Sequence, residues 1–234
     1  MDPEKRLFDL LDKWRHFPNY QLERRADVLM ALFLPGALSE FTGVELAEEL
    51  IPEFPIKRDL IWPETPTSKS VKVDYLALAA DRSKGFLIEL KTDVGSRRDA
   101  QDHYLHRASE LGLGALLDGY LAIIQATSAH QKYFHLTRQL SDLGLLRLPD
   151  ALENHLYPTP RPGLRAQLAR IERLPCANSL QIVYVQPTGG DDQQVMDFEF
   201  LATYIARFDA PFARRFAASL RTWQQAAGSA RPPG

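Results

Sequence analysis

Ionisable side chains inside two apolar strands narrow the possible folds of this chain more than any other feature. Residues 72–93 read KVDYLALAADRSKGFLIELKTD, two strand-like runs joined by a short polar turn. Asp74 interrupts the first run, and Glu89 and Lys91 interrupt the second. Burying a charge is costly unless a partner compensates it. The hairpin therefore predicts a buried functional site that contains charged side chains.

The strand period determines which of these side chains can meet. Successive side chains point to opposite faces of a strand, so Glu89 and Lys91 share a face. If Asp81 and Arg82 form the turn, Asp74 lies directly opposite Glu89. A turn of four residues would set Asp74 opposite Lys91 instead. Any even turn keeps all three side chains on one face, whereas an odd turn without a bulge separates Asp74 from the others.

Two adjacent carboxylates favour a bound cation. At about 4 Å they repel each other by roughly 4 kcal/mol at an effective dielectric constant near 20, against about 5–15 kcal/mol of net stability for a whole domain. Mg²⁺ or Mn²⁺ suits such a pair because hard cations prefer oxygen ligands. Lys91 beside the ion could orient or activate a water and stabilise charge on phosphate oxygens. Because the empty carboxylates repel, removing Glu89 is expected to cost little metal-free stability.

Asp74, fourteen further residues and the triplet Glu89-Leu90-Lys91 resemble the active-site signature of the PD-(D/E)XK nuclease superfamily. The resemblance covers about residues 53–101, and Val73 replaces the proline that often precedes the Asp. It implies an α/β fold with a restriction-endonuclease-like core, that is, a small mixed central sheet flanked by helices. The helical sequence after the hairpin would be an insertion before the last core strand.

The resemblance also implies residue roles and an activity. Asp74, Glu89 and the carbonyl of Leu90 would hold Mg²⁺ or Mn²⁺, and Lys91 would serve the attacking water. The implied activity is metal-dependent hydrolysis of nucleic acid phosphodiesters, with DNA expected as substrate rather than RNA. Because fold does not fix function, the alternative is a catalytically silent nuclease-fold binding or assembly module.

A helix after the hairpin adds a fourth candidate. Ser96 followed by Asp99 has the spacing of a capping box, which predicts a helix start near Arg97. Gln101 lies on the apolar stripe of this helix, where a polar side chain needs hydrogen-bond partners. In similar nucleases a Gln on this helix points into the site, often with a Tyr four residues on, whereas Tyr104 comes three residues on. The alternative for Gln101 is a boundary residue that touches water.

Other interpretations of the same residues stay open. Glu89 and Lys91 also fit a solvated surface pair, and an Asp74–Lys91 salt bridge would neutralise the site without a metal. His103, His106 and either Asp99 or Asp102 form a second possible metal-binding group. Their spacing of three to four residues is equally typical of a helix face exposed to solvent.

The charge balance argues against a broad nucleic-acid surface. With 28 Lys and Arg against 30 Asp and Glu, the net charge is −2, whereas strongly basic surfaces supply most non-specific affinity. Arg97 and Arg98, at a helix start, are the candidate phosphate ligands. His103 and Arg107 belong to the same basic group, and further groups are Arg24-Arg25 and Arg214-Arg215 with Arg221. We therefore expect a small footprint, a homodimer, or a protein partner that delivers the substrate.

Length and composition predict a single domain over residues 1–234, with 227–234 as a disordered tail. We expect a cytoplasmic protein that does not contact membranes. The chain has a single cysteine, Cys176, no basic apolar leader, and no apolar run long enough to span a bilayer.

Apolar periodicity predicts helices over 3–14, 21–34, 38–50, 116–146, 164–174 and 198–225, the last as two helices. It also predicts an edge strand over 53–57 and a further strand over 180–186.

Overall fold

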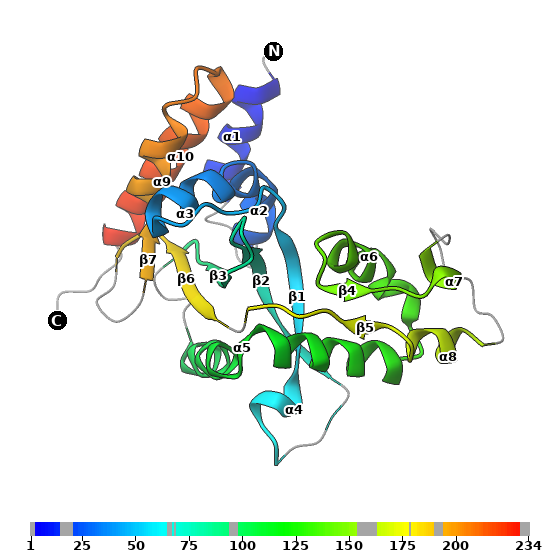
Figure 1. Ribbon diagram of the computed structural model, residues 1–234. Helices are drawn as coiled ribbons and strands as arrows, with labels where there is room; N and C mark the ends of the chain where they lie inside the picture. The colour runs from blue at the N-terminus through cyan, green and yellow to red at the C-terminus, as the bar shows by residue number, and fades with distance from the viewer. Residues whose placement is uncertain are drawn as a thin grey trace. The chain divides into compact units, whose positions relative to one another are not determined.

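A mixed sheet with helices on its flanks organises the chain. The computed structural model describes residues 3–14, 21–64, 67, 69–93, 98–153, 163–177, 179–189 and 194–229. Within them, the central sheet has five strands, and Figure 1 labels each of them. Their spatial order is β1 (Ile51–Lys57), β2 (Ser70–Leu78), β3 (Gly85–Leu90), β6 (Leu180–Gln186) and β7 (Gln194–Asp197). The predicted α/β class with a small mixed sheet is confirmed.

Two compact units divide the chain. The first consists of Met1–Leu50, Ile88–Asp102 and Ile182–Gly234, and the second of Ile51–Leu87 and His103–Gln181. The single domain expected from sequence stays a prediction.

The second unit is built around the β1–β2 pair and the first part of β3. The pair is antiparallel, with Ile51 opposite Leu76 and Lys57 opposite Ser70. β1 lies at the edge of the sheet, as its prolines predict, because proline cannot donate to a ladder. The unit also contains α4 (Arg58–Ile61), most of α5 (Asp99–Ala126), a 3-10 helix (His130–Tyr133), α6 (Phe134–Asp142), β4 (Leu146–Arg147), α7 (Asp150–Glu153), α8 (Leu164–Leu168) and β5 (Glu172–Arg173).

The turn between β2 and β3 is longer than the two-residue turn predicted from sequence. The Ala79 N–H donates to the Lys84 carbonyl at 2.9 Å, and the Arg82 N–H donates back to the Ala79 carbonyl at 2.8 Å. Arg82 takes a left-handed φ of 59° to close this loop. The loop includes one more residue on each side of Asp81-Arg82 than the predicted turn. Ala79 therefore lies opposite Lys84, the same pairing that the two-residue turn would give. The four-residue turn spans residues 80–83 and thus leaves the register unshifted. A four-residue turn sets Asp74 opposite Lys91, as expected above, when it spans residues 81–84 instead.

The first unit packs helices against the remaining strands. Its elements are α1 (Pro3–Trp14), α2 (Glu23–Ala31), α3 (Leu34–Thr42), the end of β3, β6, β7, α9 (Phe198–Ile205) and α10 (Pro211–Ser229). β6 and β7 run parallel, with Tyr184 beside Val195 and Gln186 beside Asp197. α10 lies along both α9 and α1. Aromatic rings fill the interface between α1 and α10, where Phe8 contacts Phe212 and Phe216.

Several helix boundaries differ from the sequence prediction. The helix expected over 21–34 ends at Ala31, and a new one starts at Leu34 because Pro35 is tolerated only in a first turn. This helix stops at Thr42, where Gly43 adopts a left-handed φ of 67°. The helix expected over 164–174 ends at Leu168, and the chain continues into β5, which pairs with β4.

The end of the chain also differs in part. α10 continues to Ser229, so residues 227–229 of the expected tail are helical, and 230–234 lie outside the described residues. In the described part of the chain, no helix has the length and apolar character needed to cross a membrane.

Candidate active site

A buried ion pair lies at the carboxyl end of β3. Glu89 is 2% exposed and Lys91 is 6% exposed. The Lys91 ammonium donates to Glu89 Oε1 at 2.7 Å. The two residues are two positions apart, so the strand period directs both side chains to one face. The alternative of a solvated surface pair is therefore wrong.

The neighbouring strand β6 holds this part of β3 in place. The Gly85 N–H donates to the Ser179 carbonyl at 2.9 Å, and the Lys91 N–H donates to the Val185 carbonyl at 2.8 Å. Both bonds advance by six residues in the same direction, which is the pattern of parallel strands. The carboxyl ends of parallel strands are where ligands bind in open α/β sheets. The ion pair occupies such an end.

The parallel register gives the ion pair polar neighbours on the same face. It sets Glu89 beside Tyr184 and Lys91 beside Gln186. Tyr184 is fully buried, and Gln186 is 7% exposed, with its amide donating to the Thr188 carbonyl at 2.7 Å. The face therefore carries four polar side chains that the first unit withdraws from water.

The first turn of α5 adds two contacts to this face. The Gln101 amide donates to Glu89 Oε1, the oxygen that also accepts from Lys91. The next residue, Asp102, accepts a hydrogen bond from the Tyr184 hydroxyl at 2.5 Å. Gln101 is half-buried and donates to Glu89, and the alternative of a boundary residue that touches water stays open. Adjacent residues of α5 thus attach to adjacent strands of the sheet.

The sequence does not indicate Tyr184 as a member of this cluster, and it indicates Asp102 only as a possible metal ligand beside His103 and His106. The run 180–186, LQIVYVQ, predicts only a buried strand. A tyrosine in a buried strand usually finds a hydrogen-bond partner for its hydroxyl. That rule could have pointed to a polar partner for Tyr184, but the partner's identity depends on where α5 begins.

Asp74 lies in the second unit, half-buried in the middle of β2. It shares a strand face with Lys72 and Leu76, as the period predicts. Tyr104, at the start of the second unit's part of α5, donates its hydroxyl to the Lys72 carbonyl at 3.0 Å. Tyr104 is therefore engaged as an anchor between α5 and β2. The placement of Asp74 relative to Glu89 and Lys91 stays a prediction.

Glu53, another carboxylate considered from the sequence, also lies in the second unit. The β1–β2 register places it between the pairs Pro52–Tyr75 and Phe54–Val73. Its side chain is 57% exposed and pairs with the Lys72 ammonium at 2.5 Å. Glu53 adopts a left-handed φ of 52°, which is uncommon for a residue with a side chain.

The predicted basic groups differ in what they contact. Arg98 is exposed at the start of α5, and its carbonyl accepts from the Gln101 N–H at 2.8 Å. Arg97 and Ser96 lie outside the described residues. In the C-terminal group each arginine has a carboxylate partner: Arg214 with Asp209, Arg215 with Asp9 and Asp12, and Arg221 with Glu199. These three are ion-paired helix residues.

The donor chemistry near Glu89 fits a hard cation in kind. Carboxylate and carbonyl oxygens are the ligands that Mg²⁺ and Mn²⁺ prefer, and Glu89 and Leu90 of the first unit offer such atoms. Asp74 offers a further carboxylate in the second unit. Within the described segments, no group of three or more His, Cys, Asp and Glu side chains is placed to hold a metal. This includes the alternative group around His103 and His106; Asp102 contacts Tyr184 instead.

Comparison of the chain with protein-family models, with curated proteins and with solved structures gives no match.

Proposed function

We propose that this chain is a divalent-metal-dependent nuclease that hydrolyses phosphodiester bonds of nucleic acid. The observation that carries the proposal is the buried Glu89–Lys91 pair with Gln101 on the same carboxylate oxygen. A buried ion pair contributes little to stability, because desolvating two charges offsets their attraction, and well-packed apolar residues are often as stable or more so. We therefore propose that this pair, at the end of a strand, serves chemistry rather than stability.

The fold supports the same proposal. Three consecutive strands, a helix and a later parallel strand follow the order expected of a restriction-endonuclease-like core. The turn with Ala79 opposite Lys84 has the register from which the sequence predicts Asp74 opposite Glu89. α6, α7 and α8 lie between α5 and β6, where the helical insertion is expected. β7 is a further strand beyond that core.

The proposed roles follow from the chemistry of each group. Asp74, Glu89 and the Leu90 carbonyl would hold Mg²⁺ or Mn²⁺, which when bound acts as a Lewis acid on the phosphate and acidifies a water. The Lys91 ammonium orients the attacking water and stabilises charge that develops on phosphate oxygens. The Gln101 amide keeps the Glu89 carboxylate oriented. DNA is the proposed substrate.

The alternative is a catalytically silent binding or assembly module with the same fold. One observation favours it: Lys91 and Gln101 both occupy Glu89 Oε1, so the carboxylate is compensated without any ion. The net charge of −2 agrees with this alternative.

Cleavage assays separate the two functions. We expect purified protein to cut DNA with Mg²⁺ or Mn²⁺, and Lys91→Ala to lose about 10²–10³-fold in rate, the usual scale for removing one electrostatic stabiliser. Lys91→Ala should keep nearly all Mn²⁺ affinity, whereas Asp74→Ala should lose it. Because Lys91→Ala leaves Glu89 without its cation, Lys91→Arg serves as a second variant that keeps a buried positive charge. Lys13→Ala, an exposed lysine on α1, is the control.

Binding of Mn²⁺ without cleavage of single-stranded, duplex or branched DNA or of RNA would favour the silent module. Wild-type rates in folded Lys91→Ala would refute the role given to Lys91.

A further inference from the structure

An aromatic and cationic surface lies in the second unit, outside the residues used above. Arg58, Trp62 and His103 form it, and we call these three residues the Trp62 platform. The guanidinium carbon of Arg58 lies 5.1 Å from the centroid of the Trp62 ring. The ring centroids of Trp62 and His103 are 6.1 Å apart, and the ring planes are 31° apart. Trp62 is half-buried, and Arg58 and His103 are exposed.

Backbone hydrogen bonds hold the platform in place. The Trp62 N–H donates to the Arg58 carbonyl at 3.0 Å, closing the single turn of α4 and bringing these side chains to one side of it. The Arg58 N–H donates to the Lys69 carbonyl at 3.0 Å, which fixes the other end of α4. His103 precedes the buried Tyr104, which is anchored on β2. The three side chains are therefore preorganised.

Arg58 differs from three other arginines of its unit in what its guanidinium contacts. Arg107, Arg147 and Arg173 each pair with a carboxylate. Among the side chains that the structure describes, Arg58 stacks on an indole and has no carboxylate partner. The adjacent carboxylate, Asp59, pairs with Lys57. The positive charge at the platform is therefore not neutralised within this part of the chain.

We propose that the Trp62 platform binds an unpaired nucleobase together with a neighbouring phosphate. Aromatic rings stack with the flat face of any base, and a guanidinium recognises phosphate oxygens. Only unpaired bases expose their faces for such stacking. The inference rests on the proposed nuclease function and gives its substrate class: single-stranded or locally unpaired nucleic acid. A small platform of this kind also needs no globally basic surface, which agrees with the net charge of −2.

Binding without metal tests the platform separately from catalysis. Fluorescence anisotropy would measure the affinity of the full chain in EDTA for labelled single-stranded DNA, single-stranded RNA and duplex DNA of one sequence. We expect single strands to bind tighter than the duplex. Trp62→Leu, which keeps apolar volume but loses stacking, should weaken single-strand binding by roughly 5- to 100-fold, the scale of one lost base–aromatic stack. Trp62→Phe should keep most of the affinity because it keeps a ring.

Two further variants sharpen the result. Arg58→Gln should weaken single-strand binding and reduce its salt dependence, because a phosphate contact is lost. Trp14→Leu removes a tryptophan that is 37% exposed on α1 of the first unit. This variant should change neither the affinity for single strands nor the affinity for duplex DNA. The tighter of the DNA and RNA arms identifies the natural strand, and either result supports the platform.

Failure of the inference differs from failure of the proposed function. The platform is refuted if wild type binds no single strand, or if folded Trp62→Leu binds as tightly as wild type. If wild type binds single strands through Trp62 but cuts nothing with Mg²⁺ or Mn²⁺, the platform stands and the nuclease proposal fails.

Discussion

The Tyr184 hydroxyl links β6 to the first turn of α5 beside the buried ion pair. It donates to Asp102, whose neighbour Gln101 donates to Glu89. Both contacts arise from consecutive residues of one helix turn, so releasing Asp102 should also release Gln101. At the scale of residues, Tyr184 is therefore a positioning residue for the carboxylate that the nuclease proposal needs.

Tyr184→Phe should uncouple this turn. We expect a loss of about 1.5–3 kcal/mol in the free energy of unfolding, the usual worth of a hydrogen bond to a charged group. In NMR, the Gln101 side-chain amide should exchange its hydrogens faster than in wild type, whether or not the protein is an enzyme. If cleavage is observed, the rate at saturation should fall more than the affinity for substrate.

Tyr120→Phe is the matched control. Tyr120 is also fully buried, its hydroxyl contacts Thr137 at 2.6 Å, and burial raises its pKa so that the hydroxyl stays protonated. This variant should lose stability without changing exchange at Gln101. Equal exchange in the two variants would show that Tyr184 does not position Gln101.

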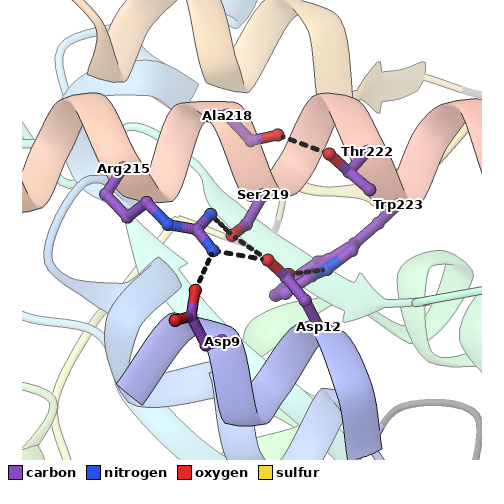
Figure 2. Close-up of polar contacts among 7 residues, drawn as sticks. All are labelled: Asp9, Asp12, Arg215, Ala218, Ser219, Thr222 and Trp223. Atoms are coloured by element: carbon purple, nitrogen blue, oxygen red, sulfur yellow. Dashed lines mark hydrogen bonds and ion pairs between the residues drawn. The ribbon is translucent and has the colours of Figure 1, made fainter. Parts of the chain in front are cut away.

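At the scale of elements, polar contacts join α1 to α10 in the first unit. Figure 2 shows Asp12 of α1 facing Arg215, Ser219 and Trp223 of α10. Asp12 Oδ1 accepts from the Trp223 indole N–H at 2.8 Å, and Oδ2 accepts from Arg215 at 2.7 Å. Trp223 is fully buried, so its N–H depends on this carboxylate. One residue of α1 thus contacts three residues of the long helix.

Asp12→Ala should lower the free energy of unfolding by about 2–3 kcal/mol, because it leaves a buried indole N–H without its acceptor. Urea unfolding measures the loss. Asp9→Ala is the control, since the Asp9 side chain is 44% exposed and makes one contact with Arg215 at 3.2 Å. A surface pair of this kind contributes about 1 kcal/mol or less. Equal losses in the two variants would contradict the role given to Asp12.

The contact between α3 and Arg207, which follows the end of α9, predicts a pH dependence. Arg207 donates to both carboxylate oxygens of Glu40, at 2.5 and 2.8 Å, and these hydrogen bonds hold the pKa of Glu40 below its usual value of 4.5. The stabilisation is therefore present above that value and is lost as the pH falls through the lowered pKa. Glu40→Gln should make the free energy of unfolding fall less steeply than in wild type between about pH 5 and 3. Glu48→Gln, at an exposed position, should leave the wild-type slope unchanged.

At the scale of the whole molecule, metal binding should appear as added stability. A cation that binds only the native state stabilises it by mass action, about 2.7 kcal/mol at a hundredfold excess over the dissociation constant. We expect Mn²⁺ to raise the melting temperature of wild type in scanning calorimetry and of the control Asp99→Asn, but not of Glu89→Gln. No rise near millimolar Mn²⁺ in wild type would argue against the metal site.

The buried partner of Glu89 changes one expectation about metal-free stability. Repulsion between carboxylates predicted that removing Glu89 costs little. In the structure Glu89 compensates the buried Lys91, so Glu89→Gln leaves an uncompensated ammonium and should cost about 3–5 kcal/mol. Lys91 and Glu89 therefore depend on each other with or without a cation.

Local sequence patterns correctly predicted the helices and strands that are defined by their own residues and not by distant partners. The helix over Pro3–Trp14 and the strand over Leu180–Gln186 have the predicted bounds, since apolar period and flanking turn residues define both. The two-residue strands β4 and β5 were missed because each exists only through its distant partner. β7 was missed for the same reason, as it is held by its register with β6.

For the candidate site, the sequence by itself determined which residues share a face, because the side-chain period of a strand is a local property. It named Glu89, Lys91 and Gln101, and the structure brings these three into contact. Only the tertiary structure decided that the pair is buried rather than solvated, and that Tyr184 and Asp102 attach α5 beside it. Burial and long-range hydrogen bonds depend on which distant segments pack together, and no window of neighbouring residues contains that information.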